Sequence, residues 1–212
     1  GQVTAVVGSS GSGKSLLAHG ILGILPYNAS LEGTITYGGE PLTRRRVEAL
    51  RGREIVLVPQ GVTYLDPLME IGPQIRRGRR DDRARVESRA VLARYGLGAE
   101  VEGMYPFELS GGMARRALIA AAVVERPKLI IADEPTPGLD ARAAGRILGH
   151  FRELAEEGAG VLLITHDLEL ALTIAHRVLV LYAGETIEEA DAADFAAGAL
   201  RHPYTRALWT AL

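Results

Sequence analysis

The sequence has no cysteine, only two lysines and no long apolar run. Without cysteine it can form neither disulfides nor thiolate metal sites and has no cysteine nucleophile, as suits a reducing compartment. Apolar stretches such as 129–132 and 161–165 fall far short of the roughly 20 residues that a membrane-spanning helix needs, so we expect none. The net charge is −2 at pH 7, which supplies no overall positive field, so nucleic acid is not an expected partner.

The chain also opens without a methionine and without a basic, then apolar, secretory leader. It begins at Gly1 almost directly on a β-branched run, so we expect the natural N-terminus to have been trimmed. With 212 residues and a hydrophobic content of 47%, the chain is long enough to bury a substantial core in one domain.

Short β-branched runs alternate with longer helical segments rich in alanine, leucine and arginine. This alternation predicts the α/β class with a mainly parallel sheet. Residues 33–37, followed by Gly38 and Gly39, predict an additional antiparallel strand that ends in a turn. The strands predicted for the main sheet are residues 3–7, 55–58, 129–132, 161–165 and 178–182.

A change of pattern between about residues 66 and 108 predicts a small helical insert. Residues 76–89 are rich in arginine, and Asp81, Asp82 and Glu87 lie between the arginines. Two interpretations stay open here, a solvated helix face with local ion pairs or a patch that binds phosphate or lipid.

A phosphate-binding loop is predicted where the first strand gives way to a helix. The pattern is G-x-x-x-x-G-K-[ST], and its glycines allow successive backbone N–H groups to point at a phosphate. The lysine would then reach the β and γ phosphates of a nucleotide, and the final serine hydroxyl would bind magnesium. The residues concerned are Gly8, Ser9, Ser10, Gly11, Ser12, Gly13, Lys14 and Ser15.

Two adjacent carboxylates, Asp133 and Glu134, end the apolar run 129–132. At the carboxyl edge of a parallel sheet, Asp133 can hold magnesium through water while Glu134 polarises an attacking water. The alternative is a strand that simply ends in solvated acids before a turn at Pro135.

A third motif, Leu109, Ser110, Gly111 and Gly112, precedes a helical run at 114–125. A hydroxyl and two glycines at a helix N-terminus can bind an anion, although no lysine accompanies them. Taken alone, the motif is a helix cap.

Together these motifs resemble the ATPases of ATP-binding-cassette (ABC) transporters, in order and spacing, over nearly the whole chain. The resemblance includes Leu109 to Gly112 just ahead of the Asp-Glu strand, then Gly138-Leu139-Asp140 and Thr165-His166-Asp167. It implies a P-loop NTPase cassette with a mainly parallel core, a small antiparallel part and a helical subdomain. As one domain of residues 1–212, its core would be about 1–65 and 127–212, and its helical subdomain about 66–126.

The resemblance implies a role for several further residues. Gln60 is similar to the family glutamine that reaches magnesium or the attacking water, and His166 to the histidine that contacts the γ-phosphate. Asp140 is similar to an aspartate that crosses between subunits. Taken singly, they would be a loop residue, a surface histidine and the N-cap of the helix at Ala141.

The resemblance also implies partners. Two cassettes pair head to tail, as a homodimer or heterodimer, so that Ser110, Gly111 and Gly112 of one close over ATP held by Lys14 of the other. Membrane permease subunits supply the channel, and the ATPase lies in the cytoplasm on the inner face of the membrane. ATP and Mg²⁺ are the implied cofactors.

A narrower resemblance comes from His202-Pro203-Tyr204-Thr205 and from residues 64–74, which are similar to the oligopeptide, dipeptide and nickel importer group. The one-residue-shorter spacing after Gln60 is closer to the nickel or metal-chelate branch. Residues 136–138, Thr-Pro-Gly, depart from the family pattern, and its adenine-stacking aromatic would lie upstream of Gly1. The rival functions are a non-transport ABC ATPase in DNA repair or translation and a nucleotide sensor that does not hydrolyse ATP.

Overall fold

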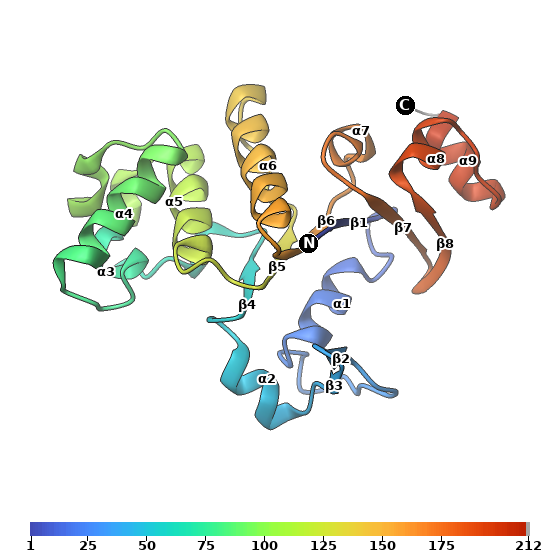
Figure 1. Cartoon of the computed structure of the whole chain (residues 1–212), viewed down its shortest axis with the longest axis horizontal. Coiled ribbons are helices and arrows are strands. Elements are labelled where there is room, and N and C mark those ends of the chain that lie inside the picture. Colours follow the sequence, from blue (N-terminus) through green and yellow to red (C-terminus); the bar gives the residue numbers. More distant parts are fainter. Residues whose placement is uncertain (211–212) are drawn as a thin grey trace.

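The computed structural model describes residues 1–210, and a six-stranded sheet lies at its centre (Figure 1). Five strands run parallel, and the sixth, at one edge, pairs antiparallel with its neighbour. This confirms the expected α/β class. In spatial order the strands are β4 (Ile55–Val58), β5 (Leu129–Asp133), β6 (Gly160–Ile164), β1 (Val3–Val7), β7 (Arg177–Tyr182) and β8 (Glu185–Asp191).

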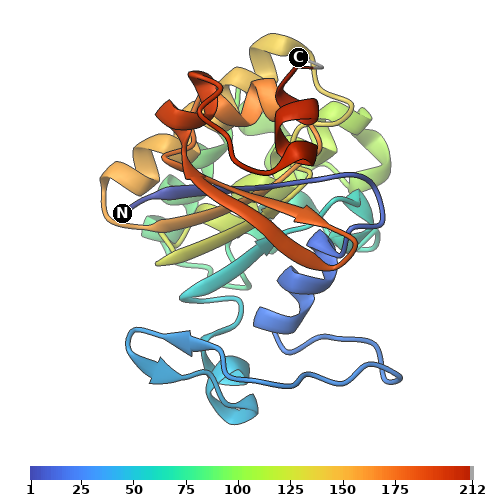
Figure 2. The ribbon, with the colours of Figure 1, turned by 90° about the vertical axis from the view of Figure 1, so that its right-hand side faces the viewer.

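Both faces of the sheet are covered by helices (Figure 2). On one face, Val3 of β1 joins a core cluster with Phe151 of α6 (Ala141–Glu156) and Leu168 of α7 (Leu168–Leu172). On the other, Val6 packs in a separate cluster with Ala18 of α1 (Lys14–Ile21). The parallel strands are apolar on both sides because each side is buried, which explains their uninterrupted β-branched runs.

A helical region lies beside the β4 edge of the sheet (Figure 1). Residues 59–128, all of them described, contain no strand. The region holds α3 (Ile71–Ile75), α4 (Asp82–Arg94), α5 (Gly111–Val123) and the 3₁₀ turns Val62–Tyr64, Ala99–Gly103 and Pro106–Glu108.

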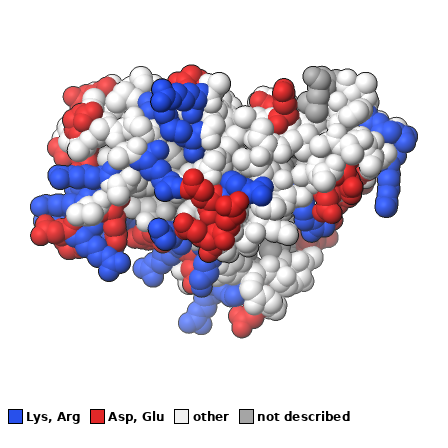
Figure 3. Space-filling view, turned by 45° about the horizontal axis from the view of Figure 1, so that its top comes forward, with Lys and Arg blue, Asp and Glu red and all other residues white. Residues whose placement is uncertain are grey.

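The arginines of this region lie interleaved with acidic side chains on its surface (Figure 3). Glu87 on α4 accepts from both Arg79, at 2.8 Å, and Arg83, at 2.9 Å, while Arg89 pairs with Glu102 at 2.8 Å. Such pairs favour the interpretation of a solvated helix face over a phosphate or lipid patch, because most of the positive charges in residues 76–89 already have acidic partners.

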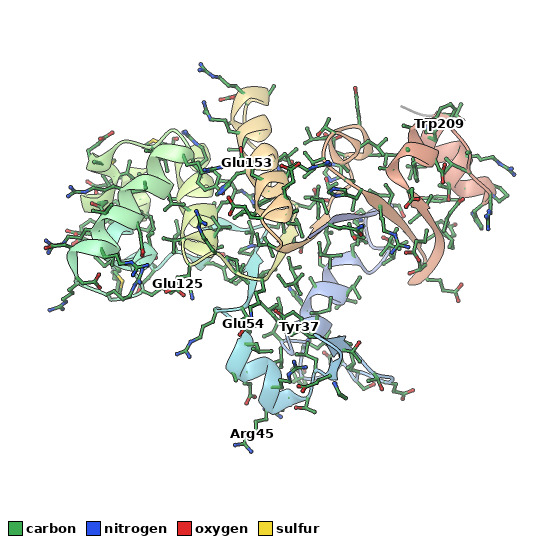
Figure 4. The ribbon with its side chains drawn as sticks, viewed as in Figure 1. Tyr37, Arg45, Glu54, Glu125, Glu153 and Trp209 are labelled. Carbon is green, nitrogen blue, oxygen red and sulfur yellow. The ribbon has the colours of Figure 1, made fainter. Side chains whose placement is uncertain are left out.

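A small antiparallel part lies on the α1 side, with β2 (Thr36–Tyr37), β3 (Glu40–Pro41) and α2 (Arg44–Leu50). The predicted strand 33–37 was too long, because β3 offers only two paired residues and Gly33 has a φ of 96° that no strand adopts. The Tyr37 hydroxyl lies 3.4 Å from a carboxylate oxygen of Glu54, which ties this part to the start of β4 (Figure 4).

The chain ends in β8 and two helices, α8 (Ala192–Ala196) and α9 (Pro203–Thr210). Strand β8 was not predicted from the sequence, because its acidic residues leave no apolar run. The carboxylate of Glu188 on β8 accepts from the backbone N–H groups of Arg201, at 2.6 Å, and His202, at 3.0 Å. The segment that begins at His202 is therefore anchored to the edge of the sheet.

The sheet register decides where the site forms. Val6 of β1 pairs with Ile164 of β6, which in turn pairs with Asp133 of β5. Because these strands are parallel and residues at or next to their carboxyl ends pair with one another, the loops that follow them lie at the same edge of the sheet.

Candidate active site

The loop between β1 and α1 curls around its own backbone. The amide of Ser12 donates to the Ser9 carbonyl at 3.2 Å, and Gly13 precedes α1 with a φ of 98°. At Gly8 a Cβ atom would lie 2.1 Å from the carbonyl oxygen of Leu181, so a side chain there would collide with β7. The predicted phosphate cradle therefore depends on glycine for both its curvature and its close approach to the sheet.

Lys14 folds back over this loop. Its ammonium donates to the carbonyls of Gly8, at 2.8 Å, and Ser9, at 2.9 Å, and the residue is only 8% exposed. The charge is thus held above the loop, where a phosphate would gain both the ammonium and the N-terminal dipole of α1.

Asp133 ends β5 as a buried carboxylate with an unused acceptor. Its Oδ1 atom has no hydrogen-bond partner among the described residues, and the residue is 6% exposed. Burial raises the pKa of the Asp133 carboxyl, the charge of Glu134 adds to this, and Ser15 and Lys14 act in the opposite direction. A buried carboxylate with a free oxygen beside a serine hydroxyl fits a hard divalent cation.

Magnesium fits this donor set better than a metal held wholly by protein. The described residues contain no group of three or more histidine or acidic side chains that could hold a metal. Mg²⁺ is usually bound through one or two carboxylates and completes its shell with water and phosphate oxygens. Ser15, Gln60 and Asp133 line the same pocket and would supply the protein oxygens.

Glu134 is held by the residues that follow β6. Its Oε1 accepts from the backbone N–H of His166 at 3.0 Å and lies 2.8 Å from that ring's Nδ1, while Oε2 lies 3.3 Å from the Thr165 hydroxyl. The residue is 8% exposed, and its φ is 47°. Residues other than glycine rarely adopt this backbone conformation, which costs free energy that the surrounding contacts must offset.

One cavity of about 500 Å³ brings most of the predicted site together. It opens at the carboxyl edge of the sheet, at the ends of β1, β4, β5 and β6. Its lining is Ser10, Gly11, Ser12, Gly13, Lys14, Ser15, Leu16, Gln60, Asp133, Glu134 and His166. Gly8 and Ser9 are not in the lining, and their carbonyls hold Lys14.

The motif Leu109 to Gly112 stands apart from this cavity. Ser110 caps α5, since its hydroxyl accepts from the Met113 amide at 3.3 Å, and both Ser110 and Gly111 are exposed. Within one chain these residues do not line the pocket of Lys14. A role in nucleotide binding would therefore require a second chain.

Asp140 caps α6, with its carboxylate accepting from the Ala143 amide at 2.8 Å. This is the N-cap role that the sequence left open. The residue is exposed, and its role across a subunit boundary stays a prediction.

Arg115 was not predicted as a site residue from the sequence. It lies on the buried face of α5, is 8% exposed and donates to the carbonyls of Pro59 and Glu134. The available signal was an arginine within the otherwise apolar face of a helix, a position where a charge has to find partners.

A second, mostly apolar groove of about 370 Å³ lies between the sheet and the helical region. Pro59 belongs to its lining, and the next residue, Gln60, lines the larger cavity. The groove is formed by Leu22, Ile24, Arg51, Gly52, Leu57, Pro59, Tyr64, Leu65, Gln74, Arg77, Leu118, Ala121 and Ala122. Among the described helices, none is long and apolar enough to cross a membrane.

Comparison with known proteins gives consistent matches. A family described as ABC transporter matches residues 1–137. The dipeptide transport ATP-binding protein DppD of Escherichia coli (strain K12) is 38% identical, over 100% of this chain and 69% of its own length. The oligopeptide transport ATP-binding protein OppD of Salmonella typhimurium is 36% identical, over 100% of this chain and 67% of its own length.

Solved structures agree in fold. A dimeric ATP-binding cassette in a post-hydrolysis state, bound to ADP and Pi, superimposes with a TM-score of 0.78 at 26% identity. The match covers 90% of this chain and 85% of that one. An ATP-binding subunit of an ABC transporter gives a TM-score of 0.81 at 25% identity, over 99% of this chain and 87% of that one.

Proposed function

The chain belongs to the ABC transporter family, and from that premise we propose that it is the ATPase subunit of a peptide importer. The observation that carries this proposal is the single cavity that joins Lys14, Asp133, Glu134 and His166. Of the cargo classes that the sequence suggested, the names of DppD and OppD support peptides over nickel. They also favour transport over a role in DNA repair or translation.

The chain is an ATPase, and its own residues suggest how the nucleotide is held. The N–H groups of residues 10–15 and the Lys14 ammonium bind the phosphates, since backbone dipoles and one point charge converge there. Ser15, Gln60 and Asp133 would hold Mg²⁺, which when bound neutralises charge on the β and γ phosphates.

Glu134 is the proposed general base. The backbone N–H of His166 and the hydroxyl of Thr165 fix its carboxylate, so a water at the γ-phosphate would meet an oriented acceptor. The side chain of His166 is 67% exposed, and it would contact the γ-phosphate from the same edge of the sheet. Water then attacks the γ-phosphorus in line with the bond to ADP, and that bond breaks as Glu134 takes the proton of the water.

A second cassette is the proposed partner at Ser110. Because this helix N-terminus is exposed and separate from the Lys14 cavity, it would close over ATP bound to another copy. One of the matched solved cassettes is itself described as dimeric.

A permease is the other proposed partner, at the apolar groove that contains Tyr64 and Gln74. The groove borders Pro59, one residue before Gln60 in the nucleotide cavity, so a permease segment lying there would be coupled to the site. This arrangement would place the chain on the inner face of the membrane.

The proposed base is tested by Glu134→Gln. The amide keeps the shape of the side chain but cannot accept a proton, so MgATP should still bind while turnover falls about 10²- to 10⁴-fold. Phosphate release and calorimetric binding of MgATP measure the two effects separately. Glu48→Gln, at an exposed glutamate on α2 that pairs with Arg44, is the control and should change neither. Near-normal turnover in Glu134→Gln would show that another group is the base.

A further inference from the structure

Arg115 is a buried charge that the proposed mechanism leaves unexplained. It lies on α5 with 8% of its surface exposed. Burial lowers the pKa of the Arg115 guanidinium, and the negative charge of Glu134 partly opposes this. A guanidinium is stable in such a place only when it has hydrogen-bond partners, so its contacts show what it holds.

One nitrogen of Arg115 joins two segments of the active site. Its Nη1 atom donates to the carbonyl of Pro59 at 3.2 Å and to the carbonyl of Glu134 at 3.1 Å. Pro59 directly precedes Gln60, and Glu134 is the proposed base. The same group therefore fixes the backbone beside both residues, without lying in the nucleotide cavity.

Glu134 needs such support because its backbone is strained. With a φ of 47°, it occupies a region that residues other than glycine rarely adopt and that persists only where the surroundings determine it. The Glu134 amide donates to the Ile164 carbonyl of β6 at 2.9 Å. Its carbonyl is held by Arg115, so the peptide groups on both sides of Cα are fixed.

We propose that Arg115 is a positioning residue for hydrolysis that ties Glu134 and Gln60 to helix α5. This deepens the proposed function and rests on Glu134 as the base. Ser110 caps the same helix, five residues before Arg115. Any movement of α5 when a second chain engages Ser110 would pass through this guanidinium to the base, so turnover depends on the position of α5.

The test is Arg115→Met, which keeps an apolar stem of similar length and removes the donors. We expect kcat for MgATP hydrolysis to fall about tenfold or more, because small displacements of a reacting group are costly, with KM changed less than about threefold. Arg115→Lys keeps one charged nitrogen on a shorter stem. It should recover part of the loss, to about three- to fivefold below wild type, again at unchanged KM.

Arg76→Met is the matched control. Arg76 is also a mostly buried arginine of the helical region, but its partner is Glu102, at 2.7 Å, away from the nucleotide cavity. This variant should lower the melting temperature without a selective loss of kcat. Arg115→Met should lose kcat beyond anything that its own melting temperature explains, when both are assayed well below melting.

Three results overturn the proposal: wild-type kcat in Arg115→Met, wild-type kcat in Arg115→Lys, or a loss of kcat that follows melting temperature equally in Arg115→Met and Arg76→Met. If Arg115→Met does not fold, the Arg115→Lys kcat and KM decide alone. Glu134→Gln is measured in parallel. Turnover retained in Glu134→Gln refutes the base, whereas an inactive Glu134→Gln beside a fully active Arg115→Met refutes only the role of Arg115.

Discussion

At the scale of single residues, a buried hydrogen bond joins the helical region to α6. The Tyr95 hydroxyl lies 2.5 Å from Nδ1 of His150, and both residues are buried. Burial raises the pKa of Tyr95, so the phenol keeps its proton and shares a hydrogen bond with Nδ1 of a neutral imidazole. Arg94, next to Tyr95, also pairs with Glu153 on α6, which Figure 4 labels.

This pair predicts a dependence of stability on pH. The pKa of His150 is lowered from 6.5 to about 4, first by burial and then by the charges of Arg94 and Arg126. Between those values the unfolded chain binds a proton that the native chain does not. The free energy of unfolding should therefore fall as pH drops from 6.5 towards 4, by roughly 3 kcal/mol in total from this residue.

Urea unfolding at several pH values measures this contribution. His150→Phe removes the titrating group and should flatten the dependence in that window. Tyr95→Phe keeps the histidine and should retain the slope while lowering stability by about 1 kcal/mol at every pH. Equal slopes for the wild type and His150→Phe would mean that this histidine does not titrate as proposed.

At the scale of elements, the N-terminus of α5 lies outside the Lys14 cavity. Its capping serine and the following glycine are exposed, and no lysine lies on this part of the surface. The Lys14 cradle, by contrast, combines a charge with a helix N-terminus in one loop. Both helix N-termini favour a phosphate anion, which is the physical basis for proposing that a second chain completes the site.

Ser110→Arg tests that composite site. A bulky cation where two chains must close should leave MgATP binding by the single chain intact but prevent ATP-driven dimerisation and hydrolysis. Light scattering and phosphate release report these effects. Normal hydrolysis by a monomeric Ser110→Arg chain would mean that the site is complete within one chain.

Mixing Ser110→Arg with Lys14→Ala is the stricter form of the test. Each variant alone should be inactive, Lys14→Ala because it lacks the charge that binds phosphate. In a mixed dimer one composite site carries both defects and the other carries neither, so part of the activity should return. No recovery, although mixed dimers are detected, would contradict independent composite sites.

At the scale of the whole molecule, the apolar groove between sheet and helical region is the proposed permease contact. Tyr64 lines this groove and is 62% exposed. Met69, in the segment between Tyr64 and α3, is 43% exposed. We expect Tyr64→Ala and Met69→Ala to lower peptide uptake per ATP hydrolysed while basal ATPase activity stays within about twofold, because neither residue lines the nucleotide cavity.

Vesicles that contain the cognate permease measure that ratio. Val86→Ala is the control, since Val86 is an exposed apolar residue of α4, 67% exposed, that lies outside the groove. It should change neither uptake nor hydrolysis. An unchanged ratio of uptake to hydrolysis in both Tyr64→Ala and Met69→Ala would argue against this surface as the contact.

The sequence by itself determined the five parallel strands of the sheet and predicted the residues of the phosphate loop. Strand bounds such as Val3–Val7 and Ile55–Val58 were predicted as the structure has them, because a parallel strand buried on both faces must be apolar throughout. Lys14 could be predicted as a phosphate-binding residue because the motif that indicates this role consists of neighbours in the chain. By contrast, β8 escaped prediction, because pairing with β7 rather than its own composition makes it a strand.

Only the tertiary structure decided how distant segments meet. Strand order and register bring Gln60, Asp133 and His166 to the edge where Lys14 lies, and no local pattern contains that order. The contacts of Arg115 with Pro59 and Glu134 likewise join residues 56 and 19 positions apart in the chain. The periodicity of apolar residues in the sequence determines which face of a helix is buried. Which backbone carbonyls of other segments that face contacts is determined only by the packing of the helix in the fold.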